Sequence, residues 1–269
     1  MKFGLSFAGV FIIVMILAID QVVASLLSIY IARIFPALTG EFPVILLQFS
    51  LLNLLYAVSV VFLVRIFTTK VYADMAFAKS PLAFFIFLAG ASFQVIGSEI
   101  ENIGSMLLGR NAAMNDIVFQ VASLPNASGM ILAFLFLAVL PPLFEEIFFR
   151  HFIQRGLGRR IGFGKALVVT SLLFALIHVN PTVVLPIFIL SLLLGYLYEK
   201  HGLGASILLH AAVNSCVVFI VRMEPQIRGL KGDTHLIEHV DFSLLISSLL
   251  FFTAALLYFF RQKKSVIHL

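Results

Sequence analysis

The segment from Pro141 to Arg150 contains two adjacent acids and an arginine, Glu145, Glu146 and Arg150, in an otherwise apolar stretch. Residues four apart lie on one face of a helix, so Glu146 and Arg150 can neutralise each other. Glu145 then lies about 100° around the helix axis, free to act as a base toward water. The alternative for this segment is a buried ion pair that only stabilises helix packing.

Two further apolar segments carry isolated polar residues at the same spacing. His178 follows Phe174 by four residues, and Asn214 follows His210 by four. At about 1.5 Å of helix rise per residue, the acids, both histidines and Asn214 reach similar depths, roughly 10 to 20 Å from the ends of their segments. We therefore expect one shared site for hydrolysis. A carboxylate and an imidazole would activate water, while Asn214 and the second imidazole would stabilise an oxyanion.

The same residue types leave a metal-dependent alternative open. Glu145, His178 and His210 are the kinds of ligand found in a catalytic zinc site with one open position. The sequence lacks the compact HExxH signature of many zinc peptidases. The single cysteine, Cys216, lies in an apolar segment and excludes both a disulfide framework and a cysteine-based zinc site.

Three spaced motifs resemble those of the CPBP family, which includes the Ras-converting CAAX endopeptidase and bacterial Abi-type proteins. They are EExxxR from Glu145, FxxxH from Phe174 and HxxxN from His210, and the resemblance covers about Pro141 to Asn214. It implies an intramembrane endopeptidase of the CAAX-protease type. It also implies a membrane-associated peptide or protein substrate, with or without a prenyl group, and no metal cofactor, with zinc as the alternative.

The resemblance also assigns roles to individual residues. By its implication Glu145 activates water with support from Glu146 and Arg150, His178 assists, and His210 with Asn214 holds the oxyanion. Phe174 is a supporting residue. A non-catalytic membrane receptor or bacteriocin-immunity protein with the same fold is the alternative function. A transporter is disfavoured because matching halves with paired broken helices are not recognisable.

Composition indicates where these residues must lie. The chain of 269 residues is 61% hydrophobic and 12% charged, with a mean hydropathy of +1.11, whereas a soluble domain has about 45–50% apolar and 25% charged residues. The long, continuous apolar stretches predict helices, so the fold class is all-α, a polytopic transmembrane bundle embedded in a lipid bilayer with its active site within the membrane. The net charge of +5 is ascribed to lysines and arginines in cytoplasmic loops, and nucleic-acid binding is not expected.

About eight spans fit this length, since each crossing needs about 20 apolar residues. The fifth and sixth are short and flank the Asn180-Pro181 turn, so one of them could be re-entrant. We divide the chain into N-terminal helices with an external loop (1–127), a CPBP-like catalytic core (128–221), and an external loop with the last helix (222–269). The predicted spans are Leu5–Ile31, Phe42–Phe67, Pro81–Gly97, Met130–Arg150, Lys165–Val179, Val183–Tyr198, Leu203–Val221 and Phe242–Phe260.

Charge bias predicts the orientation of the chain. With the N-terminus in the cytoplasm, eleven lysines and arginines lie inside and five outside, which favours both termini in the cytoplasm, at the cell membrane if the source is bacterial. The polar stretch from Ser98 to Ser128 is expected to be an external loop with a short helix. Isolated polar residues in the spans are expected to form interhelical hydrogen bonds or line a cavity: Asp20, Asn53, Gln94 and Asn102. The remaining histidines are expected to be solvated: His151, His201, His235, His239 and His268.

Overall fold

The protein is a bundle of long helices. The computed structural model describes residues 5–35, 41–67, 80–109, 118–222, 227, 229–230 and 237–262. Every regular element in these ranges is a helix, and seven of the helices are long and apolar enough to cross a membrane. The predicted all-α, multi-pass membrane architecture is therefore confirmed. Six of the seven are α1 (Phe7–Ile34), α2 (Glu41–Phe67), α3 (Ser80–Leu108), α9 (Pro181–His201), α10 (Leu203–Arg222) and α11 (Phe242–Arg261).

The seventh is one bent helix of 36 residues, Asn126–Ile161. It consists of α5 (Asn126–Ala133), the π-helical segment η3 (Phe134–Val139), α6 (Leu140–Glu146), the π-helical segment η4 (Ile147–Gln154) and α7 (Arg155–Ile161). The predicted span Met130–Arg150 was too short at both ends. Pro141 and Pro142 stand inside the helix, where each removes a backbone donor, and the chain continues through them with a wider π-helical turn on either side.

The predicted fifth span is a shorter helix than the others. Helix α8 (Phe163–Leu176) has 14 residues, a rise of about 21 Å against the ~30 Å hydrocarbon core. It ends before His178, because Val179 takes a left-handed conformation (φ 59°) ahead of Pro181. The Asn180 side chain then accepts the Thr182 N–H and caps α9. Of the fifth and sixth spans, both predicted to be short, only the fifth is short. The sixth, α9, has 21 residues and is long enough to cross a membrane.

The predicted third span and the loop after it need correction. Helix α3 continues to Leu108, so residues 98–108 of the expected external loop are helical, and residues 118–122 form the short helix expected there. The polar residues Glu99 and Asn102 end the apolar stretch but not the helix, because both make hydrogen bonds to other segments. Glu99 accepts the Val240 N–H at 2.8 Å, and the Asn102 amide donates to the Gly229 carbonyl at 2.8 Å.

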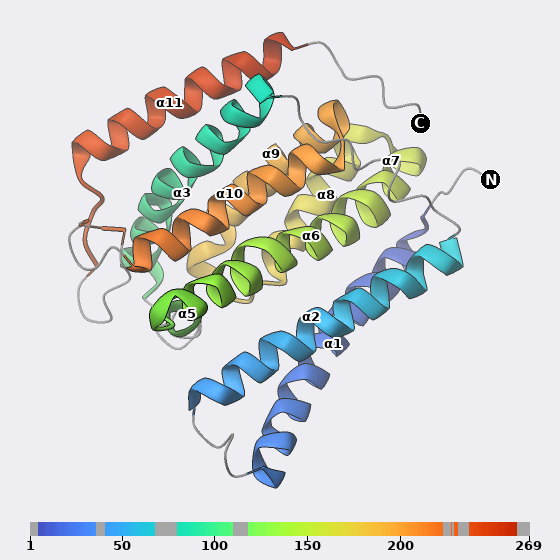
Figure 1. The fold of residues 1–269 in the computed structure, drawn as a ribbon. Coiled ribbons are helices and arrows are strands. Elements are labelled where there is room, and N and C mark those ends of the chain that lie inside the picture. Colours follow the sequence, from blue (N-terminus) through green and yellow to red (C-terminus); the bar gives the residue numbers. More distant parts are fainter. Residues whose placement is uncertain are drawn as a thin grey trace.

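Figure 1 shows the bent helix in the middle of the bundle, with α1 and α2 on one side of it and α8, α9 and α10 on the other. Helix α3 packs against α10 and α9, and α11 covers α3 on the side away from α1 and α2. The start of α1 and the end of α11 lie at the same end of the bundle (Figure 1). Eight of the basic residues used to predict orientation lie outside the described residues: Lys2, Lys70, Lys79, Arg110, Arg228, Lys231, Lys263 and Lys264.

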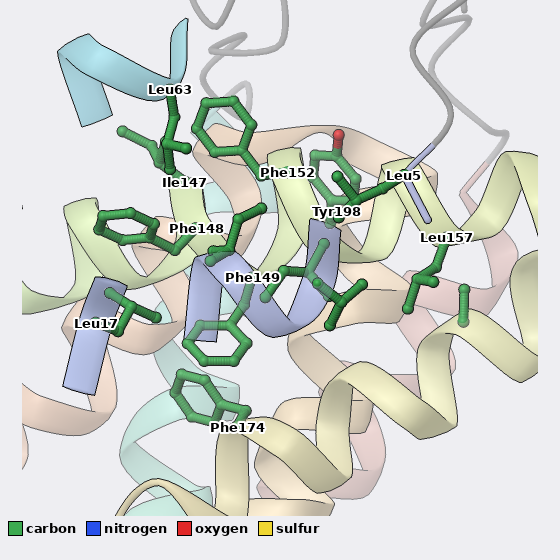
Figure 2. Close-up of a cluster of buried hydrophobic side chains, with 14 of the residues drawn as sticks. Leu5, Leu17, Leu63, Ile147, Phe148, Phe149, Phe152, Leu157, Phe174 and Tyr198 are labelled. Carbon is green, nitrogen blue, oxygen red and sulfur yellow. The ribbon is translucent and has the colours of Figure 1, made fainter. Parts of the chain in front are cut away.

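The largest core cluster surrounds η4, whose eight residues are all buried. Figure 2 shows its apolar side chains pointing between the N-terminal helices, which supply Leu17 and Leu63, and α8, which supplies Phe174. The Phe149 ring meets the edge of the Phe174 ring at a centroid distance of 4.9 Å. Lipid is as apolar as these side chains, so close packing and hydrogen bonds, rather than the hydrophobic effect, hold the helices at fixed rotations.

Isolated polar residues outside the motifs differ in how they are satisfied. Asp20 accepts a hydrogen bond from Ser59 of α2 at 2.8 Å, as the interhelical expectation requires. Asn53 and Gln94 instead bond within their own helices, to the Phe49 carbonyl and the Ser98 hydroxyl.

The expectation of solvated histidines is wrong for two of the five. His151 on η4 and His201 at the end of α9 are buried, because the helices containing them continue past the predicted span ends. The His239 side chain is exposed, although its Nδ1 lies 2.6 Å from a Glu99 carboxylate oxygen. His235 and His268 lie outside the described residues.

Candidate active site

Glu146, on the last turn of α6, is completely buried and held from two helices. Its Oε2 accepts a hydrogen bond from Arg150 Nε at 2.8 Å and another from the Ser206 hydroxyl of α10. Its Oε1 lies 3.0 Å from His210 Nδ1. The predicted ion pair with Arg150 is therefore present, and both carboxylate oxygens are occupied.

Arg150 is fully buried, and its guanidinium is distributed over several partners. One terminal nitrogen donates to the Ser191 hydroxyl of α9 at 2.9 Å, and the other lies 3.5 Å from Gln154 Oε1. Its carbon lies 5.3 Å from the centre of the Phe174 ring. Arg150 therefore links three helices: it bonds to Glu146 on its own bent helix, contacts Phe174 of α8 and bonds to Ser191 of α9.

Glu145, the neighbouring acid, has a different environment. Its side chain keeps 18% of its surface exposed, whereas Glu146 has none. Its Oε2 lies 3.9 Å from His210 Nε2, which is longer than a hydrogen bond. The two acids thus differ in environment: Glu146 is held by hydrogen bonds, whereas Glu145 is accessible to a reactant.

His210 lies between the two acids, with Nδ1 toward Glu146 and Nε2 toward Glu145. Because Glu146 already accepts two hydrogen bonds from other residues, we assign the Nδ1 proton of His210 as the donor to it. His210 Nε2 is then the nitrogen directed at the space beside Glu145. This assignment orients the imidazole as a carboxylate orients a catalytic histidine.

His178 lies in the turn after α8 and is anchored to the last turn of that helix. Its Nδ1 is 2.8 Å from the Phe174 carbonyl, which can only accept, so Nδ1 carries the proton and Nε2 has the lone pair. The Phe174 ring contacts both imidazoles, at centroid distances of 5.2 Å from His178 and 5.7 Å from His210. Phe174 therefore sets the spacing of the two histidines.

Asn214 has a partner that the sequence did not indicate. Its amide nitrogen donates to the Leu137 carbonyl of η3 at 2.8 Å. That carbonyl would receive the N–H of residue 141 in an α-helix or of residue 142 in a π-helix, and both are prolines. Asn214 thus satisfies a backbone acceptor that its own helix cannot satisfy, and it ties α10 to the helix of Glu145.

The geometry was also compared with a metal site. Among the described residues no three His, Cys, Asp or Glu side chains come together as a group able to hold a metal ion, and this includes Glu145, His178 and His210. His210 uses Nδ1 on Glu146 and has Nε2 directed toward Glu145. The zinc alternative stays a prediction.

The sequence reasoning missed three polar residues of the site. Ser206 precedes His210 by four residues and Gln154 follows Arg150 by four, so the same-face spacing could have indicated both. Ser191 stands in an apolar stretch of α9 without a spaced partner, and its sequence gives no signal. All three are buried.

The chain was compared with protein families, curated proteins and solved structures, and one family model matches the segment that contains the site. Residues 127–216 match a family model described as type II CAAX prenyl endopeptidase Rce1-like. The matched segment runs from α5 to α10. It contains all the polar site residues described above: Glu145, Glu146, Arg150, Gln154, His178, Ser191, Ser206, His210 and Asn214. No curated protein and no solved structure matches the chain.

Proposed function

We propose that this chain, whose residues 127–216 match the Rce1-like family of CAAX-type membrane endopeptidases, cleaves a membrane-associated protein or peptide by metal-free hydrolysis at Glu145. The observation that supports this mechanism most is the asymmetry of the two acids. Glu146 is saturated by hydrogen bonds, whereas Glu145 is partly exposed and lies beside His210 Nε2.

In the proposed reaction Glu145 accepts a proton from a water molecule, whose oxygen attacks the carbonyl carbon of the scissile peptide bond. The proton then passes from the Glu145 carboxylic acid to the leaving nitrogen as the C–N bond breaks. The products are a new carboxylate and a new amine. His178, with its lone pair on Nε2, assists as a second acceptor for the water proton.

The negative oxygen of the tetrahedral intermediate needs donors in a site shielded from bulk water. We assign this role to His210, whose Nε2 takes up a proton from solvent before the water attacks, and to the second N–H of the Asn214 amide, since the first is engaged by Leu137. The Glu146 carboxylate stabilises the resulting imidazolium. Removal of one such donor typically costs about 10²–10³ in kcat.

The substrate is proposed to be a membrane-anchored protein or peptide, with or without a prenyl group. The site lies on helices long enough to span a membrane, so a substrate already held in lipid would not have to leave it. We place the end of the bundle that carries the start of α1 and the end of α11 in the cytoplasm, on the basis of the predicted charge bias. In a bacterium the protein would be located in the cell membrane.

The experiment that tests this proposal is mass-spectrometric detection of cleavage by the purified, reconstituted protein. Wild type and Glu145→Gln are incubated with prenylated and unprenylated peptides, each with and without a chelator. Cleavage by wild type alone, unaffected by chelator, is the expected result. Cleavage that chelator abolishes would overturn the metal-free mechanism, and equal cleavage by both proteins would exclude Glu145 as the base. Wild-type protein that is folded but cuts no peptide would favour the receptor or immunity function.

A further inference from the structure

Two buried serines outside the recognised motifs make hydrogen bonds to the Arg150–Glu146 pair. Ser206 lies on α10, one turn before His210, and Ser191 lies on α9. Both are fully buried. Each makes its hydrogen bond to a charged group of the site, Ser206 to Glu146 and Ser191 to Arg150.

The contacts divide the two oxygens of Glu146 between different tasks. Oε2 accepts from Arg150 Nε and from Ser206, and Oε1 is left for His210 Nδ1. Arginine and a carboxylate prefer a two-bond arrangement in which two guanidinium nitrogens bind both oxygens. Here that arrangement is absent, because the terminal nitrogens of Arg150 are directed at Ser191 and Gln154 instead.

We propose that Ser206 and Ser191 are positioning residues that keep the Arg150–Glu146 pair singly bonded, so that Glu146 Oε1 remains available to orient His210. Ser191 retains the guanidinium nitrogen that would otherwise reach Oε1. Ser206 satisfies Oε2 and thereby holds the carboxylate in its present rotation. This proposal rests on the proposed function for its catalytic consequence, although the orientation of His210 can be observed without catalysis.

Loss of either hydroxyl has a defined consequence. The guanidinium can close on both carboxylate oxygens and turn the carboxylate, and His210 Nδ1 then competes with it for Oε1. The imidazole becomes free to rotate or to carry its proton on Nε2 in the neutral form. The effect reaches the substrate only through His210, so it alters the chemical step and leaves substrate binding nearly unchanged.

The test compares Ser206→Ala and Ser191→Ala with Ser171→Ala in the full-length, reconstituted protein. Ser171 is the matched control, since it is a fully buried serine of α8 whose hydroxyl has no hydrogen-bond partner among the described residues. ¹⁵N NMR of selectively labelled histidine reports which nitrogen of His210 carries the proton, and peptide cleavage reports kcat and KM. Ser206→Thr, which retains a hydroxyl, tests rescue.

We expect the His210 ¹⁵N signals to change in Ser206→Ala and Ser191→Ala but not in Ser171→Ala. We also expect kcat to fall by about tenfold, the size that corresponds to one charge-assisted hydrogen bond, with KM within about twofold. Unchanged His210 signals in both variants would overturn the proposal whatever the activity. Changed signals with no detectable cleavage by wild type would support the positioning while counting against the proposed function.

Discussion

The hydrogen bond from Asn214 to the Leu137 carbonyl leads to a prediction about stability that does not depend on catalysis. The carbonyl lacks a helical donor because positions 141 and 142 are prolines, and Asn214 supplies one at 2.8 Å. Asn214→Ala leaves a buried acceptor unsatisfied, at a cost of about 1–2 kcal/mol. Pro141→Ala gives position 141 an N–H that can donate to Leu137 in the α-helical pattern.

The two changes should therefore compensate. In the Pro141→Ala background, Asn214→Ala should cost less than about 0.5 kcal/mol, which is a coupling of about 1 kcal/mol in the double-mutant cycle. Pro186→Ala is the matched control, because Pro186 also stands inside a helix, α9, but its new α-helical N–H reaches the carbonyl of Thr182 and not that of Leu137.

The assay is reversible unfolding of the full-length protein in lipid–detergent bicelles, with the free energy of unfolding measured for the four members of each cycle. Additive effects of Pro141→Ala and Asn214→Ala, or equal coupling with Pro186→Ala, would refute the role assigned to the Leu137 carbonyl. Cleavage by the double mutant separates the two functions of Asn214. If stability returns and activity does not, the amide also acts in the reaction.

Three further perturbations test the packing and charges of the site. Glu146→Gln should reduce the free energy of unfolding by about 3–5 kcal/mol, because it leaves the buried Arg150 guanidinium without its carboxylate; Glu145→Gln serves as the comparison and should cost below about 1 kcal/mol. A Glu146→Gln protein as stable as wild type would contradict the buried pair. Gly195→Ala places a methyl group against Gln154 Oε1 and the Leu167 side chain, so we expect about 1–3 kcal/mol of destabilisation and a lower kcat. Gly164→Ala is the control, because a methyl group there meets nothing within 4 Å, and it should be nearly neutral in both unfolding and cleavage assays. Gly90→Ala places a methyl 2.6 Å from the Ala212 Cβ and should lower the melting temperature by separating α3 from α10, and an unchanged melting temperature would show that this contact relaxes freely.

The sequence by itself determined the fold class and the groupings of residues on each helix. The long apolar segments permit only helices in a membrane, because lipid cannot satisfy exposed backbone groups. A spacing of four residues places side chains on one face, which was sufficient to pair Glu146 with Arg150 and to leave Glu145 apart. These properties are local, so they can be deduced from one segment at a time.

Helix ends were less predictable than helix faces. Helix α3 passes through Glu99 and Asn102, because residues from a distant segment satisfy both. The bent helix passes through Pro141 and Pro142, because π-helical turns and Asn214 compensate for the missing donors. Neither compensation can be deduced from the segment in which the helix would otherwise end.

Only the tertiary structure decided how the faces of different helices meet. The contacts of Ser191 with Arg150 and of Ser206 with Glu146 depend on the rotation and depth of α9 and α10 relative to the bent helix. The sequence of one helix shows which residues share a face, but it does not show how that helix is rotated and shifted relative to its neighbours. That relation comes from side-chain packing and interhelical hydrogen bonds, which exist only once the bundle has formed.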